Sequence, residues 1–155
     1  MLVLALDSSA TASVALARID SDAPGASAEI LASYESEDTR SHAEVMAPYA
    51  AQILADTGLD GAAVDAVLTG TGPGPFTGLR AGIMTARTLG FAWNKPVYGL
   101  MSLTAIVERA FADGAFRDSQ TAANSGMNRA AHETLVASDA RRREIYYALF
   151  AVTEN

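Results

Sequence analysis

A glycine- and proline-rich segment has the residue types that most directly suggest chemistry in this sequence. Residues 68–80 read LTGTGPGPFTGLR, in which a short apolar run leads into a loop and then into a helix-like pattern. Glycine permits backbone conformations and close approaches that a Cβ would forbid, and the glycines concerned are Gly70, Gly72, Gly74 and Gly78. A strand-to-helix turn of this kind is either a cradle for a phosphate group or a tight structural corner.

The prolines and the missing lysine favour the structural corner. A Walker A loop would end in Gly-Lys-Ser or Gly-Lys-Thr, and no lysine follows these glycines. The dinucleotide fingerprint is also broken, because Pro75 stands where its third glycine would be. Pro73 and Pro75 lack the backbone N–H groups with which a cradle binds phosphate. We therefore predict that the segment turns the chain sharply and starts a closely packed helix.

Other side chains give little indication of a catalytic centre. His42 and His132 are far apart in the sequence, and neither has a neighbour at the spacing of metal ligands, so we expect no metal site. The absence of cysteine excludes thiolate ligands, disulfides and a cysteine nucleophile. No serine lies in a nucleophile-elbow pattern. The arginine run 141–143 could contact nucleic-acid phosphates, although a charged turn is usually just solvated.

Length and charge restrict the class of protein. A chain of 155 residues, 50% of them hydrophobic, suits a compact core of one domain, or one lobe and part of another. The net charge of −7 makes it a poor binder of nucleic acid on its own, because phosphate neutralisation needs clustered Lys and Arg. The apolar run after Met1 is too short for a signal peptide or a membrane span, so we expect a cytoplasmic protein.

The elements that would position these residues follow from the apolar patterns. Continuous apolar runs predict strands over 2–6, 13–18, 29–35, 64–69, 96–100, 135–138 and 145–152. Helical spacing predicts helices over 41–57, 77–93 and 102–112, the first with a capping box at Ser41 and Glu44 and a stop at Gly58. This order is typical of the mixed α/β class. The strand–Asp–turn–strand pattern of 2–18 recurs at 135–151, as in a duplicated protein with two lobes.

Two predicted helices carry stripes of small residues, which indicate that another surface approaches closely. Glycine in a helix interior costs roughly 1 kcal/mol relative to alanine, so two glycines in one helix require a reason. The close neighbour is either the lobe's own sheet or a second protein, and we take the second protein as the working hypothesis. The stripes consist of Ala47, Ala51 and Ala55 in the first helix, and Gly82, Ala86 and Gly90 in the second.

A set of short motifs in a fixed order resembles the TsaB (YeaZ) family of bacterial proteins of tRNA threonylcarbamoyladenosine synthesis. The GPGPFTGLR segment is the most specific of them, and together they extend over essentially the whole chain. Two features depart from the family: Pro75 replaces its usual serine, and family members are longer. The motifs are Asp7-Ser-Ser, Ser41-His42, Gly72 to Arg80, Ser102-Leu103, and Asp139-Ala-Arg141 with Glu144-Ile-Tyr146.

The resemblance implies a fold and a division of the chain. The fold would be the two-lobed, actin-like ATPase fold (ribonuclease H-like), with a mixed sheet flanked by helices. Residues 1–100 would form a complete first lobe with the partner-binding helices, and residues 101–155 a connecting helix and the start of a partial second lobe. That second lobe would expose apolar surface or a sheet edge that needs a partner.

The resemblance also implies a function. The protein would be a non-catalytic scaffold or activator that pairs with its paralogue TsaD, with TsaE as a further subunit and TsaC supplying the activated intermediate. It would self-pair when alone and meet tRNA only through the complex, and no cofactor would be required. The alternatives are an ATP- or phosphate-binding enzyme and a peptidase acting on TsaD. In the non-catalytic function, ATP or ADP would bind only at a partner interface and would make weak contacts at most, through Asp7, Ser8, Ser9, Gly72, Gly74 and Asp139.

Overall fold

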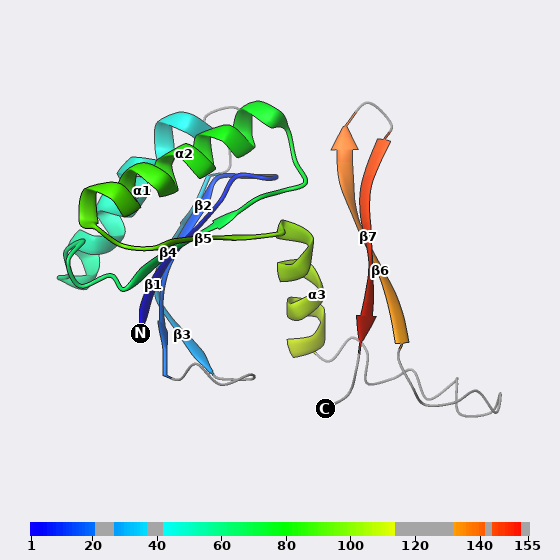
Figure 1. Cartoon of the computed structure of the whole chain (residues 1–155), viewed down its shortest axis with the longest axis horizontal. Coiled ribbons are helices and arrows are strands. Elements are labelled where there is room, and N and C mark those ends of the chain that lie inside the picture. Colours follow the sequence, from blue (N-terminus) through cyan, green and yellow to red (C-terminus); the bar gives the residue numbers. More distant parts are fainter. Residues whose placement is uncertain (21–26, 37–41, 114–131, 142–143, 153–155) are drawn as a thin grey trace. The chain divides into compact units, whose positions relative to one another are not determined.

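The computed structural model describes residues 1–20, 27–36, 42–113, 132–141 and 144–152. The chain divides into two compact units, Met1–Met101 and Ser102–Asn155, which are described separately below (Figure 1). No helix in the described ranges is both long and apolar enough to cross a membrane.

The first unit is a five-stranded mixed sheet with two helices. Its strands have the order β3-β2-β1-β4-β5, in which β1 pairs antiparallel with β2 and parallel with β4. Because β1 and β4 are parallel neighbours, their carboxyl ends lie at the same edge of the sheet. The elements are β1 (Leu2–Asp7), β2 (Ser13–Ile19), β3 (Ala28–Glu35), α1 (His42–Thr57), β4 (Ala66–Gly70), α2 (Phe76–Trp93) and β5 (Val97–Leu100).

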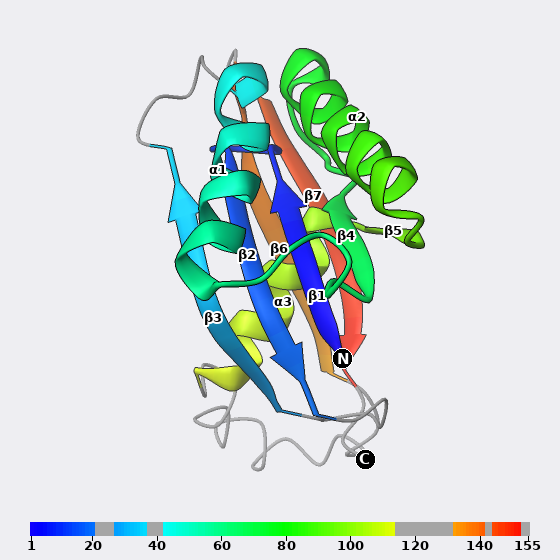
Figure 2. The same ribbon diagram turned by 90° about the vertical axis from the view of Figure 1, so that its left-hand side faces the viewer.

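The core of this unit lies between the sheet and its helices. Leu4 and Leu6 of β1 alternate with outward residues along the strand, and their cross-strand partners in β2 are Leu16 and Val14. Helix α1 adds Met46, Ala50 and Ile53 to the same cluster, all of them fully buried. Figures 1 and 2 show α1 and α2 on the same face of the sheet.

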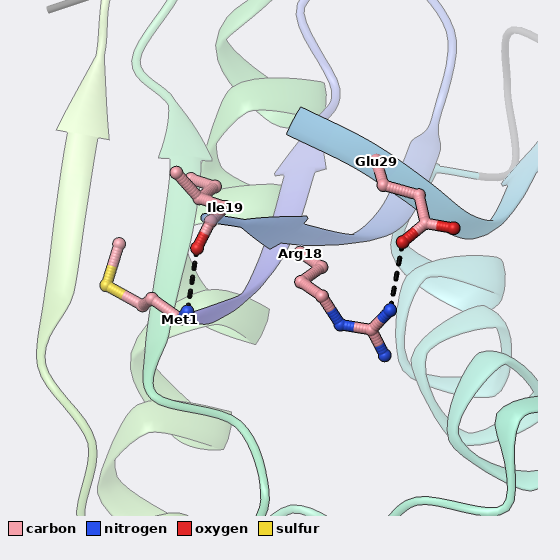
Figure 3. A network of polar contacts seen from close by, with 4 residues as sticks. All are labelled: Met1, Arg18, Ile19 and Glu29. Atoms are coloured by element: carbon pink, nitrogen blue, oxygen red, sulfur yellow. Dashed lines mark hydrogen bonds and ion pairs between the residues drawn. The ribbon is translucent and has the colours of Figure 1, made fainter. Parts of the chain in front are cut away.

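Polar contacts join the start of the chain to its neighbouring strands. The Met1 amino group donates a hydrogen bond of 2.8 Å to the Ile19 carbonyl oxygen at the end of β2. Arg18 in turn forms a 2.9 Å ion pair with Glu29 of β3 (Figure 3). Both contacts are exposed, so they contribute little stability individually.

Polar contacts of Asp56 hold the C-terminal half of α1 on the edge strand β3. The Tyr34 hydroxyl donates to the Asp56 carboxylate at 2.6 Å, and the Gln52 amide donates to the other oxygen at 2.7 Å. The Tyr34 ring also stacks on Tyr49, with 5.5 Å between the ring centroids. Helix α1 ends at Thr57, and Gly58 adopts a left-handed φ of 66°, as the predicted stop requires.

The second unit is a helix packed on a hairpin. It contains α3 (Ser102–Ala112), β6 (His132–Arg141) and β7 (Glu144–Val152), and the two strands are antiparallel. Leu103 and Val107 of α3 bury Val136 of β6. The opposite face of the hairpin exposes apolar side chains, namely Leu135, Ile145, Tyr147 and Leu149.

The predicted order of elements is confirmed, and α3 has the predicted bounds. The two strands of the second unit were predicted too short, because Asp139 pairs with Ile145 and Arg141 with Glu144, between the predicted strands 135–138 and 145–152. The predicted cap at Ser41 and the tip residues Arg142 and Arg143 lie outside the described residues, as does the polar stretch 114–131.

Candidate functional site

Five of the candidate nucleotide-contact residues lie together at one edge of the first sheet. Asp7 ends β1, Ser8 and Ser9 follow it, and Gly72 and Gly74 follow β4. Because the two strands are parallel neighbours, the turn after β1 lies beside the loop after β4. The sixth candidate, Asp139, lies in β6 of the second unit, so the site described here consists of first-unit residues.

The turn and the loop touch through their backbones. A Cβ added to Gly74 would lie 2.5 Å from the Ser9 carbonyl oxygen and 2.7 Å from the Ser9 Cα. Gly72 has a φ of 90°, and a Cβ there would meet Leu79 at 2.8 Å. Only glycine fits at either position, which explains two of the glycines in the segment.

Helix α2 is packed onto the same turn. Ser8 is 1% exposed, and its hydroxyl donates a 2.7 Å hydrogen bond to the Gly78 carbonyl oxygen in the first turn of α2. A Cβ on Gly82 would lie 2.3 Å from the Ser8 Oγ. The missing side chain at Gly82 therefore makes room for a buried serine of the same lobe.

The turn uses its own polar groups internally. The Asp7 carboxylate accepts a 2.7 Å hydrogen bond from the Ser9 N–H and a 2.5 Å bond from the Ser9 hydroxyl. The Thr11 hydroxyl donates to Glu35 at 2.7 Å. A phosphate at this turn would have to replace these bonds, since both serine hydroxyls already have acceptors. The geometry is that of a tightly packed corner, and no group of acidic or histidine side chains in the described ranges could hold a metal ion.

The glycine stripe of α2 faces the interior of the lobe, and this corrects the interface predicted for it. Gly82, Ala86 and Gly90 are all buried. A Cβ on Gly90 would lie 2.2 Å from the Val97 side chain of β5, just as Gly82 meets Ser8. The close neighbour that the stripe indicated is therefore the lobe's own sheet, which was the alternative interpretation.

The alanine stripe of α1 faces outward. Ala47, Ala51 and Ala55 are exposed, while Met46, Ala50 and Ile53 face the core. This stripe therefore presents a smooth surface on the outside of the first unit.

Helix α2 has an outer stripe that sequence reasoning missed. Arg80, Met84, Arg87 and Phe91 are spaced four, three and four residues apart, and all four are exposed. The exposed fraction is 50% for Met84 and 90% for Phe91. The glycine positions could have predicted that this stripe is exposed, because residues 84 and 91 lie opposite the Gly82–Ala86–Gly90 stripe on a helical wheel.

The sheet order and its alternating helices define the class of protein as the actin-like, ribonuclease H-like fold, as predicted. A family model described as TsaD, tRNA N6-adenosine threonylcarbamoyltransferase, matches residues 29–154. The chain belongs to this family.

Individual relatives show which members of the family the chain resembles. The chain is 34% identical over 109 residues to the Haemophilus influenzae tRNA threonylcarbamoyladenosine biosynthesis protein TsaB, covering 70% of this chain and 40% of that protein. An uncharacterized Mycobacterium tuberculosis protein is 42% identical over 113 residues, covering 73% and 44%. The structure of YeaZ from Pseudomonas aeruginosa superposes with a TM-score of 0.72 at 29% identity, covering 99% and 61%.

These comparisons confirm the resemblance to TsaB (YeaZ) that the motifs indicated. The chain spans less than half the length of the two relatives matched by sequence.

Proposed function

We propose that the protein is a non-catalytic subunit that pairs with TsaD in the complex that makes threonylcarbamoyladenosine beside the tRNA anticodon. In this proposal TsaD carries the catalysis, TsaE is a further subunit, and TsaC supplies the threonylcarbamoyl-adenylate. Membership of the TsaD family and similarity to proteins named TsaB support the pathway. The packed, internally bonded turn after β1 supports the non-catalytic role.

The proposed pairing surface is the outside of α1 and α2. It combines the smooth alanine stripe of α1 with the outer stripe of α2. The observation that carries the proposal is the exposure of Phe91, 90% accessible on a helix that already buries its glycine face. An exposed aromatic and an exposed methionine beside small residues are typical of protein interfaces, whose cores are enriched in such side chains.

Pairing is tested with Ala51→Arg, because Ala51 is exposed and arginine is nearly as good a helix former as alanine. We expect the variant to fold normally and to lose co-purification with TsaD. Ala112→Arg is the matched control, since Ala112 is an exposed helical alanine outside the proposed surface. Wild-type recovery of TsaD by Ala51→Arg would exclude this surface.

Gly82→Leu is not a suitable test of the pairing surface. Gly82 faces Ser8 and Met46 inside the lobe, so a leucine there would disrupt folding. Loss of pairing would then say nothing about the surface.

A second candidate function is nucleotide binding by the first unit. It is favoured by one observation, the convergence of Asp7, Ser8, Ser9, Gly72 and Gly74 at the ends of β1 and β4. Calorimetry with ATP and magnesium distinguishes the two functions. Tight binding that is lost in Asp7→Asn would support an enzyme of the actin-like fold, whereas weak or absent binding is expected of a scaffold subunit.

A further inference from the structure

The cationic residues of α2 differ from the other basic residues in having no protein partner within the described part of the chain. Arg18 pairs with Glu29, Arg109 pairs with Asp113, and the Lys95 ammonium donates to the Ala62 carbonyl oxygen. Arg80 and Arg87 make no such contact with any described residue.

This lack of partners is unexpected from the composition. The chain has 18 acidic against 11 basic residues, so carboxylates are in excess. Yet α2 contains no acidic residue in its 18 positions, and its only charged residues are these two arginines. The charged side chains of helix α2 are therefore all positive, although the protein as a whole is acidic.

The arrangement of the two arginines is regular. They are seven residues apart, which corresponds to about 10 Å along the helix axis. Met84 lies between them and Phe91 lies one turn beyond, so cations and apolar side chains alternate along one stripe. Arginine beside exposed aromatic and methionine side chains is the composition of interface hot spots.

We infer that the outer stripe of α2 binds an acidic surface of the protein partner, with carboxylates about 10 Å apart on either side of an apolar contact. This inference rests on the proposed pairing and specifies its chemistry. Arg–carboxylate pairs give orientation and faster association, while Met84 and Phe91 supply the apolar burial. A nucleic-acid partner is disfavoured, because apolar side chains separate the arginines and the chain carries a net charge of −7.

The test measures the affinity of the 155-residue chain for TsaD at low and at high salt. Arg80→Glu/Arg87→Glu should weaken binding roughly tenfold or more at low salt, since it places like charges opposite each other. Arg80→Gln/Arg87→Gln should weaken binding less and should remove most of its salt dependence. Arg109→Glu is the matched control, because Arg109 lies on α3 and is paired with Asp113. This variant should bind as the wild type does.

The outcomes separate this inference from the proposed function. If charge reversal leaves affinity and salt dependence unchanged while Ala51→Arg abolishes pairing, the acidic partner surface is wrong and the pairing stands. If the wild type does not bind TsaD at all, both fail. If charge reversal spares TsaD binding but removes crosslinking to tRNA in the assembled complex, the stripe contacts RNA phosphates and the inference is overturned.

Discussion

Gly82 of helix α2 faces Ser8 of the turn after β1, with no room for a side chain at position 82. We expect Gly82→Ala to destabilise the protein by about 1 to 2 kcal/mol, although alanine is the better helix former by about 1 kcal/mol. The new Cβ would lie 2.3 Å from the Ser8 Oγ and 3.2 Å from its Cβ. Urea unfolding of single and double variants measures the effect.

The Ser8→Gly background is the control for that contact. It removes the two Ser8 atoms that crowd the Gly82→Ala methyl group and leaves Met46 at an ordinary contact distance of 3.6 Å, so the same change should be neutral or stabilising there. Additive effects of the two substitutions would mean that the contact does not limit the packing of α2.

The hydrogen bond between Tyr34 and Asp56 leads to a second prediction at the residue scale, which concerns the pH dependence of stability. The Tyr34 hydrogen bond, followed by that from Gln52, lowers the pKa of Asp56 below its ordinary value of 3.8. A lowered folded-state pKa means that the contribution to stability is present above pH 3.8 and is lost as the pH falls through the folded-state pKa. The Tyr34→Phe variant should therefore be less stable than the wild type near neutral pH, and the difference should vanish in acid.

Alkaline titration checks the same pair from the other side. The hydrogen bond to Asp56, aided by burial and by the Asp56 charge, raises the pKa of Tyr34 above its ordinary value of 10.0. Its contribution is present below pH 10.0 and is lost as the pH rises through the folded-state value. Thermal unfolding of wild type and Tyr34→Phe across both ranges measures it, and a difference that does not change with pH would contradict the assigned pair.

At the scale of elements, substitutions on the two faces of the β6–β7 hairpin should differ in their cost to stability. Val136 is 7% exposed against α3, whereas the adjacent Leu135 is 62% exposed on the other face. We expect Val136→Ala to cost about 1 to 2 kcal/mol, because it removes two buried methyl groups and leaves a small cavity. Leu135→Ala should cost much less.

Amide hydrogen exchange of β6 and β7 measures this difference locally. Exchange should accelerate in Val136→Ala and remain near the wild-type rate in Leu135→Ala. Equal acceleration in both variants would mean that the exposed face of the hairpin is also buried in solution.

The sequence predicted the order of helices and strands better than the contacts that each of them makes. The apolar runs, the Ser102 start and the Gly58 stop predicted the order of elements, because these are local signals. The lengths of β6 and β7 were underestimated because Asp139 gains its strand conformation from Ile145 across the hairpin. A local apolar pattern contains no information about such a partner.

The candidate site illustrates the same limit. The candidate residues Asp7, Ser8, Gly72 and Gly74 lie close together in the fold, yet their spacing in the sequence did not show that the turn and the loop fill each other's space. The Gly82 stripe indicated a close neighbour but not its identity, which proved to be Ser8 of the same lobe. Small residues in a helix indicate that another surface packs closely against them. Only the fold shows which surface that is.

At the scale of the whole molecule, net charge predicts the behaviour toward tRNA. With a net charge of −7, the chain alone should not retard tRNA in a gel-shift experiment at physiological salt, because phosphate binding requires clustered cations and releases counterions. Addition of TsaD should produce a retarded species that contains both proteins. Arg80→Glu/Arg87→Glu should lose this chain from that species, since the proposed contact is with the protein and not with the RNA. Retardation of tRNA by the chain alone, weakening steeply with salt, would show instead that the outer stripe of α2 or the arginine run 141–143 binds RNA directly.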